Sequence, residues 1–325
     1  MALLEIRDLS VDYLMEGGRV HAVDHVSLSL EEGTSLGIVG ESGSGKSTLG
    51  MAVLRLLDPG SASVTGSVRF DGEELLTMPE ARLRQVRWQA LAAVFQKSMN
   101  ALSPVHRIGQ QMADVYRLHH PEADKAACRA RVLEVLRQVD LAERVYRLYP
   151  HELSGGMMQR VSIALSLLNH PKLVIFDEAT TALDVITQGQ ILKEIQRLEM
   201  ELGLTRMMIT HDISVVATSC THVAVLYAGR LMEVGPAASV LRHPAHPYTA
   251  GLMAAFPSLT GEKKPLQGIP GSLPDLTQTI PGCVFAPRCP YATEACRSAQ
   301  PALEQVEPGW QAACCHRLGE VKDHG

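Results

Sequence analysis

The stretch Ile38-Val-Gly-Glu-Ser-Gly-Ser-Gly-Lys-Ser-Thr48 decides the fold of this chain, because it matches the phosphate-loop pattern G-x-x-x-x-G-K-[ST] from Gly40 to Ser47. A short apolar strand pattern, Leu36 to Val39, precedes the loop, and a helical pattern follows it from Ser47 to Leu57. Glycines let the backbone approach a polyphosphate closely, and the N-terminus of the following helix supplies positive potential. The stretch therefore predicts a polyphosphate site between a strand and a helix.

Two side chains of this loop have specific expected roles. Lys46 would reach the β- and γ-phosphates of a nucleotide, and the Ser47 hydroxyl would ligate Mg²⁺. An ordinary glycine-rich turn before a helix is the alternative, and the complete set of fixed positions disfavours it. The residues assigned to nucleotide binding here are Gly40, Ser42, Gly43, Ser44, Gly45, Lys46, Ser47 and Thr48.

The composition is that of a folded chain with a sizeable core, since 46% of the 325 residues are hydrophobic and 20% are charged. The formal net charge of −5 argues against non-specific nucleic-acid binding through a global basic field. The N-terminus lacks a signal-peptide pattern, and no stretch reaches the ~18 uninterrupted apolar residues of a membrane-spanning helix. We therefore expect an intracellular protein whose membrane role is peripheral.

The pattern of the remaining chain predicts an α/β fold. Residues 3–39 and 64–76 show β-patterns that predict an antiparallel layer, with a turn at Asp71-Gly72. Residues 105–149 carry helical spacing and interrupt the α/β core as a helical insert. Residues 222–235 predict a β-hairpin that turns near Gly229. Together with the strands described next, these patterns predict a parallel core sheet beside the antiparallel layer.

A second anion site is predicted at Leu153-Ser-Gly-Gly-Met-Met-Gln-Arg160, which opens a helix. Ser154 can cap this helix, and Gly155 and Gly156 leave bare N–H groups at its positive end. Because the phosphate loop already surrounds one nucleotide, this site makes best sense if it closes on a nucleotide held by another subunit. An ordinary capped helix start is the alternative.

Acidic residues and a histidine follow two further predicted strands. Asp177 and Glu178 come directly after Leu173–Phe176, and His211 follows Arg206–Thr210. Strands of α/β sheets place ligands at their carboxyl ends, so Asp177 would join the Mg²⁺ shell and Glu178 would polarise the attacking water. His211 would contact the γ-phosphate. A solvated acidic loop and a structural histidine are the alternatives.

In this order the motifs resemble those of ATP-binding cassette ATPases, over residues 1 to about 240. The resemblance implies that Tyr13 stacks on adenine, although ordinary strand packing is an equal alternative from spacing alone. It implies that Gln96 senses Mg²⁺ and couples to the transport domains. It also implies that Ser154, Gly155 and Gly156 contact ATP across a head-to-tail dimer.

The same resemblance implies that Glu178 is the catalytic base, Asp184 an interface aspartate and His211 a switch histidine. The chain departs from the family at Ala179, where proline usually follows the catalytic glutamate. It departs again at Met157 and Met158, where glutamine and then arginine often follow the Leu-Ser-Gly-Gly element. Neither departure removes a catalytic group, so we expect activity.

The C-terminal part is similar to the extension of oligopeptide/dipeptide/nickel importer ATPases. The segments that carry this resemblance are His246–Leu252, Ile269–Pro274, Cys283–Pro290 and Asn100–Pro104. It implies a cassette domain over residues 1–240, with a helical insert at about 97–160, and an extension over 241–325. It also implies a second homologous ATPase subunit, two membrane permeases docked near Lys97–Val105, and an extracytoplasmic substrate-binding protein that acts indirectly. The chain would then lie peripherally on the cytoplasmic face of the cell membrane.

The tail is rich in proline and cysteine. Residues 256–325 hold nine of the eighteen prolines, so we expect an irregular, loop-rich extension that needs a ligand to order it. Four thiolates suit zinc or an iron–sulfur cluster, but zinc sites usually show closer cysteine pairs. The resembled subfamily implies a [4Fe–4S] cluster; zinc, free cysteines or disulfides are the alternatives. The expected ligands are Cys283, Cys289, Cys296 and one of Cys314 and Cys315.

These features predict an ATP-hydrolysing, Mg²⁺-dependent energy-coupling subunit of an importer for peptides or related small solutes. ATP binding would close two ATPase chains, and hydrolysis would reopen them. A soluble cassette ATPase of translation or DNA repair is the alternative from another class. The single cassette and the lack of sustained heptads disfavour that alternative, and the importer-like tail disfavours an exporter.

Overall fold

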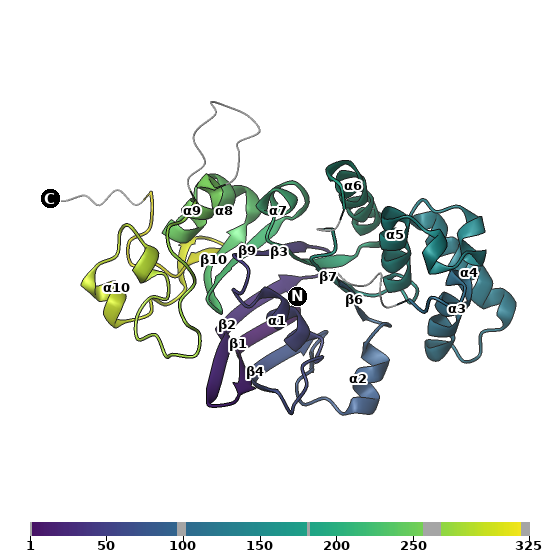
Figure 1. Ribbon diagram of the computed structural model, residues 1–325, viewed down its shortest axis with the longest axis horizontal. Coiled ribbons are helices and arrows are strands. Elements are labelled where there is room, and N and C mark those ends of the chain that lie inside the picture. Colours follow the sequence, from purple (N-terminus) through teal and green to yellow (C-terminus); the bar gives the residue numbers. More distant parts are fainter. Residues whose placement is uncertain (1, 96–101, 181–182, 256–267, 320–325) are drawn as a thin grey trace. The chain divides into compact units, whose positions relative to one another are not determined.

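The structure is a computed structural model that describes residues 2–95, 102–180, 183–255 and 268–319 (Figure 1). The chain folds as two compact units. The first unit consists of residues 1–76 and 209–325, and the second unit consists of residues 77–208.

The first unit contains a four-stranded antiparallel sheet in the order β2-β1-β4-β5. Its strands are β1 (Ala2–Met15), β2 (Gly18–Glu31), β4 (Ala62–Phe70) and β5 (Glu73–Glu74). Leu4 and Ile6 of β1 are buried, and so are Leu9 and Val11 beyond a register shift between Ile6 and Leu9, because alternate residues of a strand face the same side. Asp71 and Gly72 both have positive φ, at 51° and 81°, as a tight hairpin turn requires. The predicted antiparallel layer and its turn are confirmed.

A second group of strands in the first unit begins with β3 (Ser35–Val39), which runs parallel to β9 (His222–Tyr227). β10 (Arg230–Pro236) returns antiparallel to β9 through Ala228 and Gly229, whose φ values are 49° and 78°. This confirms the predicted hairpin. Two strands from the tail, β12 (Trp310–Ala312) and β11 (Glu304–Glu307), extend the sheet beyond β10. The sequence pattern gave no sign of these two tail strands.

The tail shares a hydrophobic core with the strands of the first unit. Tyr227, Tyr248, Phe285 and Trp310 are all buried in this core. Residues on both sides of the predicted boundary near residue 240 therefore pack into one hydrophobic core. The helical segments of this unit are α1 (Lys46–Val53), α7 (Ile213–Ser219), α8 (Ala237–Arg242), α9 (Pro247–Ala254), the 3₁₀ turn η4 (Ala286–Arg288) and α10 (Glu294–Ser298).

The second unit holds β6 (Leu91–Phe95) parallel to β7 (Leu173–Asp177), with β8 (Thr205–Ile209) on the other side of β7. Apolar residues predominate in these parallel strands, as in strands covered on both faces, and the polar Thr205 and Arg206 of β8 are fully buried as well. The helices are α2 (Glu80–Val86), α3 (Ile108–His119), α4 (Lys125–Gln138), α5 (Gly155–Ser166), α6 (Val185–Leu202) and the 3₁₀ turns η2 (Glu143–Arg147) and η3 (Pro150–Glu152).

Helix α4 confirms the predicted helical insert. Asp124 caps its N-terminus by accepting a hydrogen bond from the Ala127 N–H at 2.7 Å. The buried Arg131 donates to the carbonyl oxygens of Leu167 and Leu168, at 2.7 and 2.8 Å, and so satisfies the C-terminal end of α5. Cys128 is buried in α4, as expected of a core residue.

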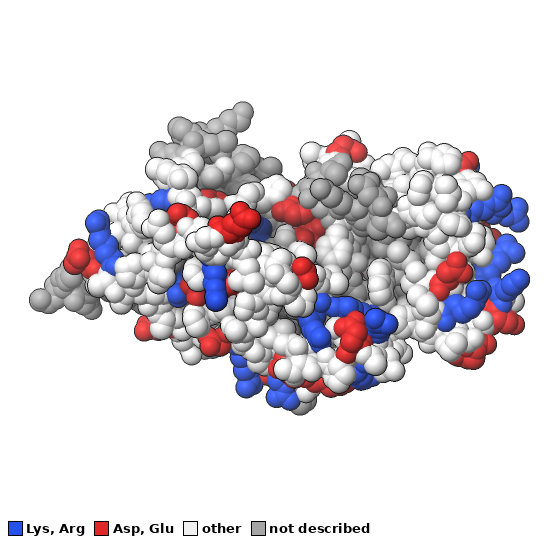
Figure 2. Space-filling view, turned by 60° about the horizontal axis from the view of Figure 1, so that its bottom comes forward, with Lys and Arg blue, Asp and Glu red and all other residues white. Residues whose placement is uncertain are grey.

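The described surface is of mixed charge. On the face shown in Figure 2, basic and acidic side chains are interspersed. This mixture agrees with the small net charge of −5. Among the described residues, none of the helices combines the length and the apolar character needed to cross a bilayer.

Candidate functional site

The phosphate loop joins β3 to α1, and its backbone can be built only with glycine at two points. Gly40 has φ 154° and Gly45 has φ 94°, and an added Cβ would lie 2.1 Å from the carbonyl oxygen of Leu226 or Ala22 respectively. Such contacts are far inside van der Waals distance, so any side chain here would force the loop open. The loop conformation is therefore fixed by close approach to neighbouring backbone.

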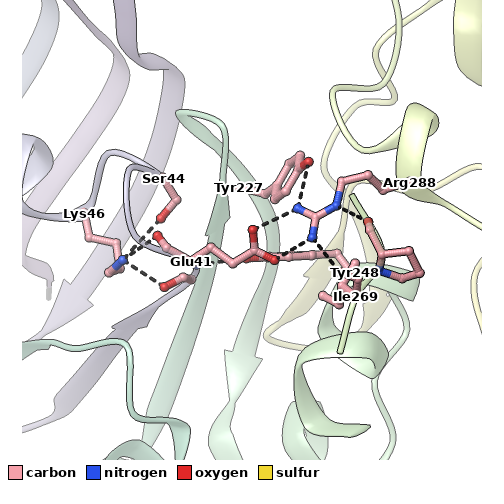
Figure 3. Close-up of polar contacts among 9 residues, drawn as sticks. Glu41, Ser44, Lys46, Tyr227, Tyr248, Ile269 and Arg288 are labelled. Carbon is pink, nitrogen blue, oxygen red and sulfur yellow. Dashed lines mark hydrogen bonds and ion pairs between the residues drawn. The ribbon is translucent and has the colours of Figure 1, made fainter. Parts of the chain in front are cut away.

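The Lys46 ammonium lies against the loop (Figure 3). Its Nζ donates to the carbonyl oxygens of Gly40 and Glu41, both at 2.8 Å, and to Ser44 Oγ at 3.4 Å. Only 6% of Lys46 is exposed, and Ser44 is completely buried. The cation is thus held beside the N-terminus of α1, where its charge and the helix dipole both favour an anion.

Two further predicted residues lie near the loop within the first unit. The Tyr13 hydroxyl is 3.2 Å from Thr48 Oγ1 in the first turn of α1, so the tyrosine lies beside the nucleotide loop as well as in the β layer. The backbone N–H of Thr210 donates to the carbonyl of Ile38 in β3 at 3.1 Å. His211 follows with an exposed side chain, at the edge where the strand leads into the loop.

The second unit carries the predicted acids at the end of β7. Asp177 and Glu178 are both partly buried, and Glu178 has φ 50°. A left-handed backbone is uncommon for a residue other than glycine and is concentrated at functional sites. No pattern in the sequence predicts this conformation. Ala179 in place of proline leaves Glu178 without the backbone restriction that a following proline imposes.

The segment Leu153–Arg160 and Asp184 lie together in the second unit. Ser154 caps α5 by accepting from the Met157 N–H at 3.3 Å, as predicted. Asp184 caps α6, because it accepts from the N–H groups of Ile186 and Thr187 and from the Thr187 hydroxyl. These hydrogen bonds, that of the Thr187 side chain above all, lower the pKa of Asp184. The starts of α5 and α6 lie close together, because a Cβ added at Gly156 would be only 2.9 Å from Thr187 Cγ2.

The capping role of Asp184 was missed from the sequence, although Asp before a helix with Thr three residues later is a recognisable cap signal. Gln96 and residues 97–101 of the predicted permease contact lie outside the described residues. The first unit therefore gathers Tyr13, the phosphate loop and His211. The second unit holds the two acids at the end of β7, and it brings the segment Leu153–Arg160 next to the start of α6 at Asp184.

The five tail cysteines are free thiols of the first unit. They lie close together, since negative charge on Cys296 or Cys289 would raise the pKa of Cys283, and negative charge on Cys289, Cys283 or Cys315 would raise the pKa of Cys314, each beside the larger effect of burial. Backbone N–H groups hydrogen-bond to the sulfurs of several of them; the N–H of His316, for example, lies 3.3 Å from Cys314 Sγ. Hydrogen bonds of this kind tune thiolate ligands in metal sites.

The thiols are not arranged as ligands in the described structure. Burial raises the pKa of Cys283, of Cys289 and, to about 11, of Cys314, so these thiols are protonated at neutral pH. Cys296 differs, since hydrogen bonds from Thr293 lower its pKa although burial acts the other way. Among the described residues, no three His, Cys, Asp or Glu side chains are placed to hold one metal ion. The donor set fits a thiolate-bound group in its chemistry, and its members would have to rearrange to bind one.

Two family models match the chain. The model described as ABC transporter matches residues 23–181, and the model described as oligopeptide/dipeptide transporter, C-terminal region, matches residues 232–296. The chain is 44% identical over 322 residues to the oligopeptide transport ATP-binding protein OppD of Escherichia coli, covering 98% of this chain and 95% of that protein. It is also 44% identical over 314 residues to OppD of Haemophilus influenzae, covering 96% of each.

Solved structures agree with these matches. A dimer of the ATP-binding cassette MJ0796, in a post-hydrolysis state with ADP and Pi bound, gives a TM-score of 0.65 at 29% identity, covering 72% of this chain and 98% of that one. The structure of cbiO1 from Clostridium perfringens, part of the ABC transporter complex cbiONQ, gives 0.63 at 28% identity, covering 74% and 91%. The motifs, the α/β fold and identity over nearly the whole length establish that this chain is an ATPase belonging to the ABC transporter ATP-binding proteins.

Proposed function

We propose that the chain is the energy-coupling subunit of an importer for peptides or related small solutes. One observation carries the proposal: an intact phosphate loop and an oligopeptide/dipeptide-type C-terminal region occur in one chain. Relatives that match it along almost their whole length are named oligopeptide transport ATP-binding proteins. Energy from ATP would then drive a membrane permease through closure and reopening of an ATPase dimer.

ATP hydrolysis would use the residues that the sequence motifs assign. Lys46 would reach the β- and γ-phosphates, while Ser42, Gly43, Ser44 and Thr48 would line the phosphate site. Mg²⁺ neutralises phosphate charge when it binds with ATP, and Ser47, Asp177 and Gln96 are the residues to hold it. Glu178 would take the proton of the attacking water, and His211 would contact the γ-phosphate.

Glu178→Gln tests this assignment most directly. The amide cannot accept the proton, so ATP turnover should fall by at least 10²-fold while ATP binding is retained. The measurement is steady-state phosphate release beside binding of a labelled ATP. Turnover within a few-fold of the parent chain would refute Glu178 as the base.

The working form would be a head-to-tail pair of ATPase chains. Ser154, Gly155 and Gly156 would contact the nucleotide of the partner chain, and Asp184 would lie at the interface. Val185 and Ile186 directly after Asp184 are 85% and 75% exposed, which is unusual for large aliphatic side chains and favours a covered surface in the assembly. A related cassette was solved as a dimer.

The proposed partners are a second homologous ATPase, two permeases and, indirectly, an extracytoplasmic substrate-binding protein. The chain would lie peripherally on the cytoplasmic face of the membrane. A tagged pull-down from detergent-solubilised membranes of the native host tests this set. Recovery of two permeases with a second cassette ATPase is expected. Recovery of ribosomal or DNA-repair proteins without permeases would favour a soluble cassette ATPase instead.

We further propose that the tail binds a [4Fe–4S] cluster through Cys283, Cys289, Cys296 and one of Cys314 and Cys315. The nearness of the five thiols and the N–H groups directed at their sulfurs support this proposal. A bound cluster would cross-link a tail that has few regular elements. Anaerobic purification with iron, sulfide and zinc analysis tests it. About four irons per chain are expected; a colourless protein with under about one iron, or with zinc instead, would refute it.

A further inference from the structure

Glu41 is the second residue of the phosphate loop. The C-terminal region binds two of its three polar groups, the backbone N–H and the carboxylate (Figure 3). Its backbone N–H donates to the Tyr248 hydroxyl at 3.0 Å, and its carboxylate accepts from Arg288 at 2.8 and 3.1 Å. Its carbonyl accepts from the Lys46 ammonium at 2.8 Å. Glu41 therefore connects the lysine that faces the phosphates to side chains more than two hundred residues away in sequence.

Arg288 is built to hold one position. Its guanidinium binds the Glu41 carboxylate with both terminal nitrogens, in the fork-to-fork geometry that gives arginine its directional strength. The other N–H groups donate to the carbonyls of Pro270 and Ile269, at 2.7 and 3.0 Å, and to the Tyr227 hydroxyl at 3.3 Å. All five N–H donors are used, and the side chain is 7% exposed.

Arg288 lies beside buried aromatic rings that come from the tail motifs and from β9. Tyr227, Tyr248 and Phe285 are fully buried and pack ring against ring, with centroids 4.6 to 5.3 Å apart. Leu273, from the segment that also supplies Ile269 and Pro270, lies against the loop, since a Cβ on Gly43 would be 3.3 Å from its Cδ1. An exposed ion pair would contribute little, but the Arg288 side chain of this pair is 7% exposed and that of Glu41 is 28% exposed. The guanidinium is also held by two backbone carbonyl groups and the Tyr227 hydroxyl.

From this geometry we propose that Arg288 is a positioning residue of the nucleotide site: by clamping Glu41 it keeps the phosphate loop and Lys46 in the nucleotide-binding conformation. The proposal rests on the proposed role of the loop in binding ATP. Arg288 contacts the loop at the Glu41 carboxylate, so its effect should appear in nucleotide affinity and little in the rate of the chemical step. The C-terminal region thereby acts as a structural part of the ATP site.

The test is a double-mutant cycle on the full chain, with the affinity for a non-hydrolysable ATP analogue and Mg²⁺ measured by calorimetry. Arg288→Met, Glu41→Ala and the double variant should each weaken binding by about tenfold, or about 1.4 kcal/mol. The double variant should be no weaker than either single one, since one contact is lost in all three. In turnover assays KM should rise while kcat stays within about threefold.

Arg317→Met is the matched control, because the ion pair of Arg317 with Glu304 and its hydrogen bond to the carbonyl oxygen of Gln305 both lie inside the tail. It should leave nucleotide affinity within about twofold whatever it does to the melting temperature. Equal affinities in the Arg288 and Arg317 variants, or additive losses in the double variant, would overturn the clamp. Absence of nucleotide binding in the parent chain would instead refute the loop assignment, so the two failures are distinguishable. If Arg288→Met does not fold, the same cycle is measured with Glu41→Ala and Tyr248→Phe, because the Tyr248 hydroxyl also binds Glu41.

Discussion

The phosphate loop and the cysteine tail are two candidate ligand sites of one unit, and they differ in how far they are arranged before any ligand binds. The loop is fixed by glycines in close backbone contact, and Lys46 is already placed on two carbonyl groups. The tail holds five thiols, and burial raises the pKa of most of them. Among the described residues, no three of these thiols are placed to hold one metal ion. Backbone geometry alone can form an anion site. In a thiolate site, the free energy of ligand binding must drive the deprotonation of the thiols and the ordering of the chain around them.

The largest effect expected from this comparison lies in the loop. Lys46→Met removes the cation that faces the phosphates while the glycine-built backbone stays, so ATP turnover should fall by about 10³-fold. The melting temperature should change by under about 3 °C, and Mg-ATP should no longer raise it. Phosphate release and thermal unfolding with and without Mg-ATP measure this. If the variant unfolds, the loop needs Lys46 to keep its structure. The loop would then not be fixed by its backbone alone, and it would no longer differ from the tail in this respect.

The tail should respond in the opposite way, through stability. Glu233 in β10 is completely buried and accepts from the N–H groups of Ala245 and His246 at 2.8 and 3.0 Å, and from Trp310 Nε1 at 2.8 Å. Burial raises the pKa of this carboxyl, and the three donors offset part of its desolvation. Glu233→Ala leaves these donors unsatisfied and should lower the free energy of unfolding by about 3 kcal/mol.

Chemical denaturation of the full chain measures this loss, and Trp310→Phe is its control. That variant removes one donor and keeps an aromatic ring, so it should cost about 1 kcal/mol. Nucleotide affinity of molecules that remain folded should be unchanged in both variants. A loss of under about 0.5 kcal/mol in Glu233→Ala would show that the tail is not fastened to β10 by this carboxylate.

The sequence predicted the loop well because its chemistry is local. A glycine at a fixed spacing, a lysine and a helix start are all within eleven residues, Ile38 to Thr48. The same holds for Ser154 and for the turn at Asp71-Gly72. What the sequence concealed depends on contacts far along the chain. Arg288 reaches Glu41 across 247 positions, and the tail strands form only because β10 offers them an edge. The left-handed backbone of Glu178 likewise has no local signal.

The smallest expected effect sharpens the comparison through pH. His246 caps α9 at the start of the C-terminal region, where its Nδ1 accepts from the Tyr248 N–H at 3.0 Å, and it is 1% exposed. Burial lowers its pKa to about 4 from the ordinary 6.5, so the folded chain keeps it neutral while the unfolded chain protonates it below pH 6.5. The stabilisation is therefore complete above pH 6.5 and is lost as the pH falls toward 4, by about 2 kcal/mol between pH 7 and pH 5.

His246→Asn isolates this contribution, because asparagine also caps helices and does not titrate. Denaturation of both proteins at pH 7 and pH 5 should give a parent chain that loses about 2 kcal/mol more than the variant. The buried carboxyl of Glu233, which accepts from the His246 N–H, titrates in both proteins and so cancels in the difference. Equal losses in the two proteins would mean that His246 takes up a proton in the folded state. The packing around α9 would then rearrange as readily as the cysteines do. The C-terminal region would need its bound ligand to order α9 as well.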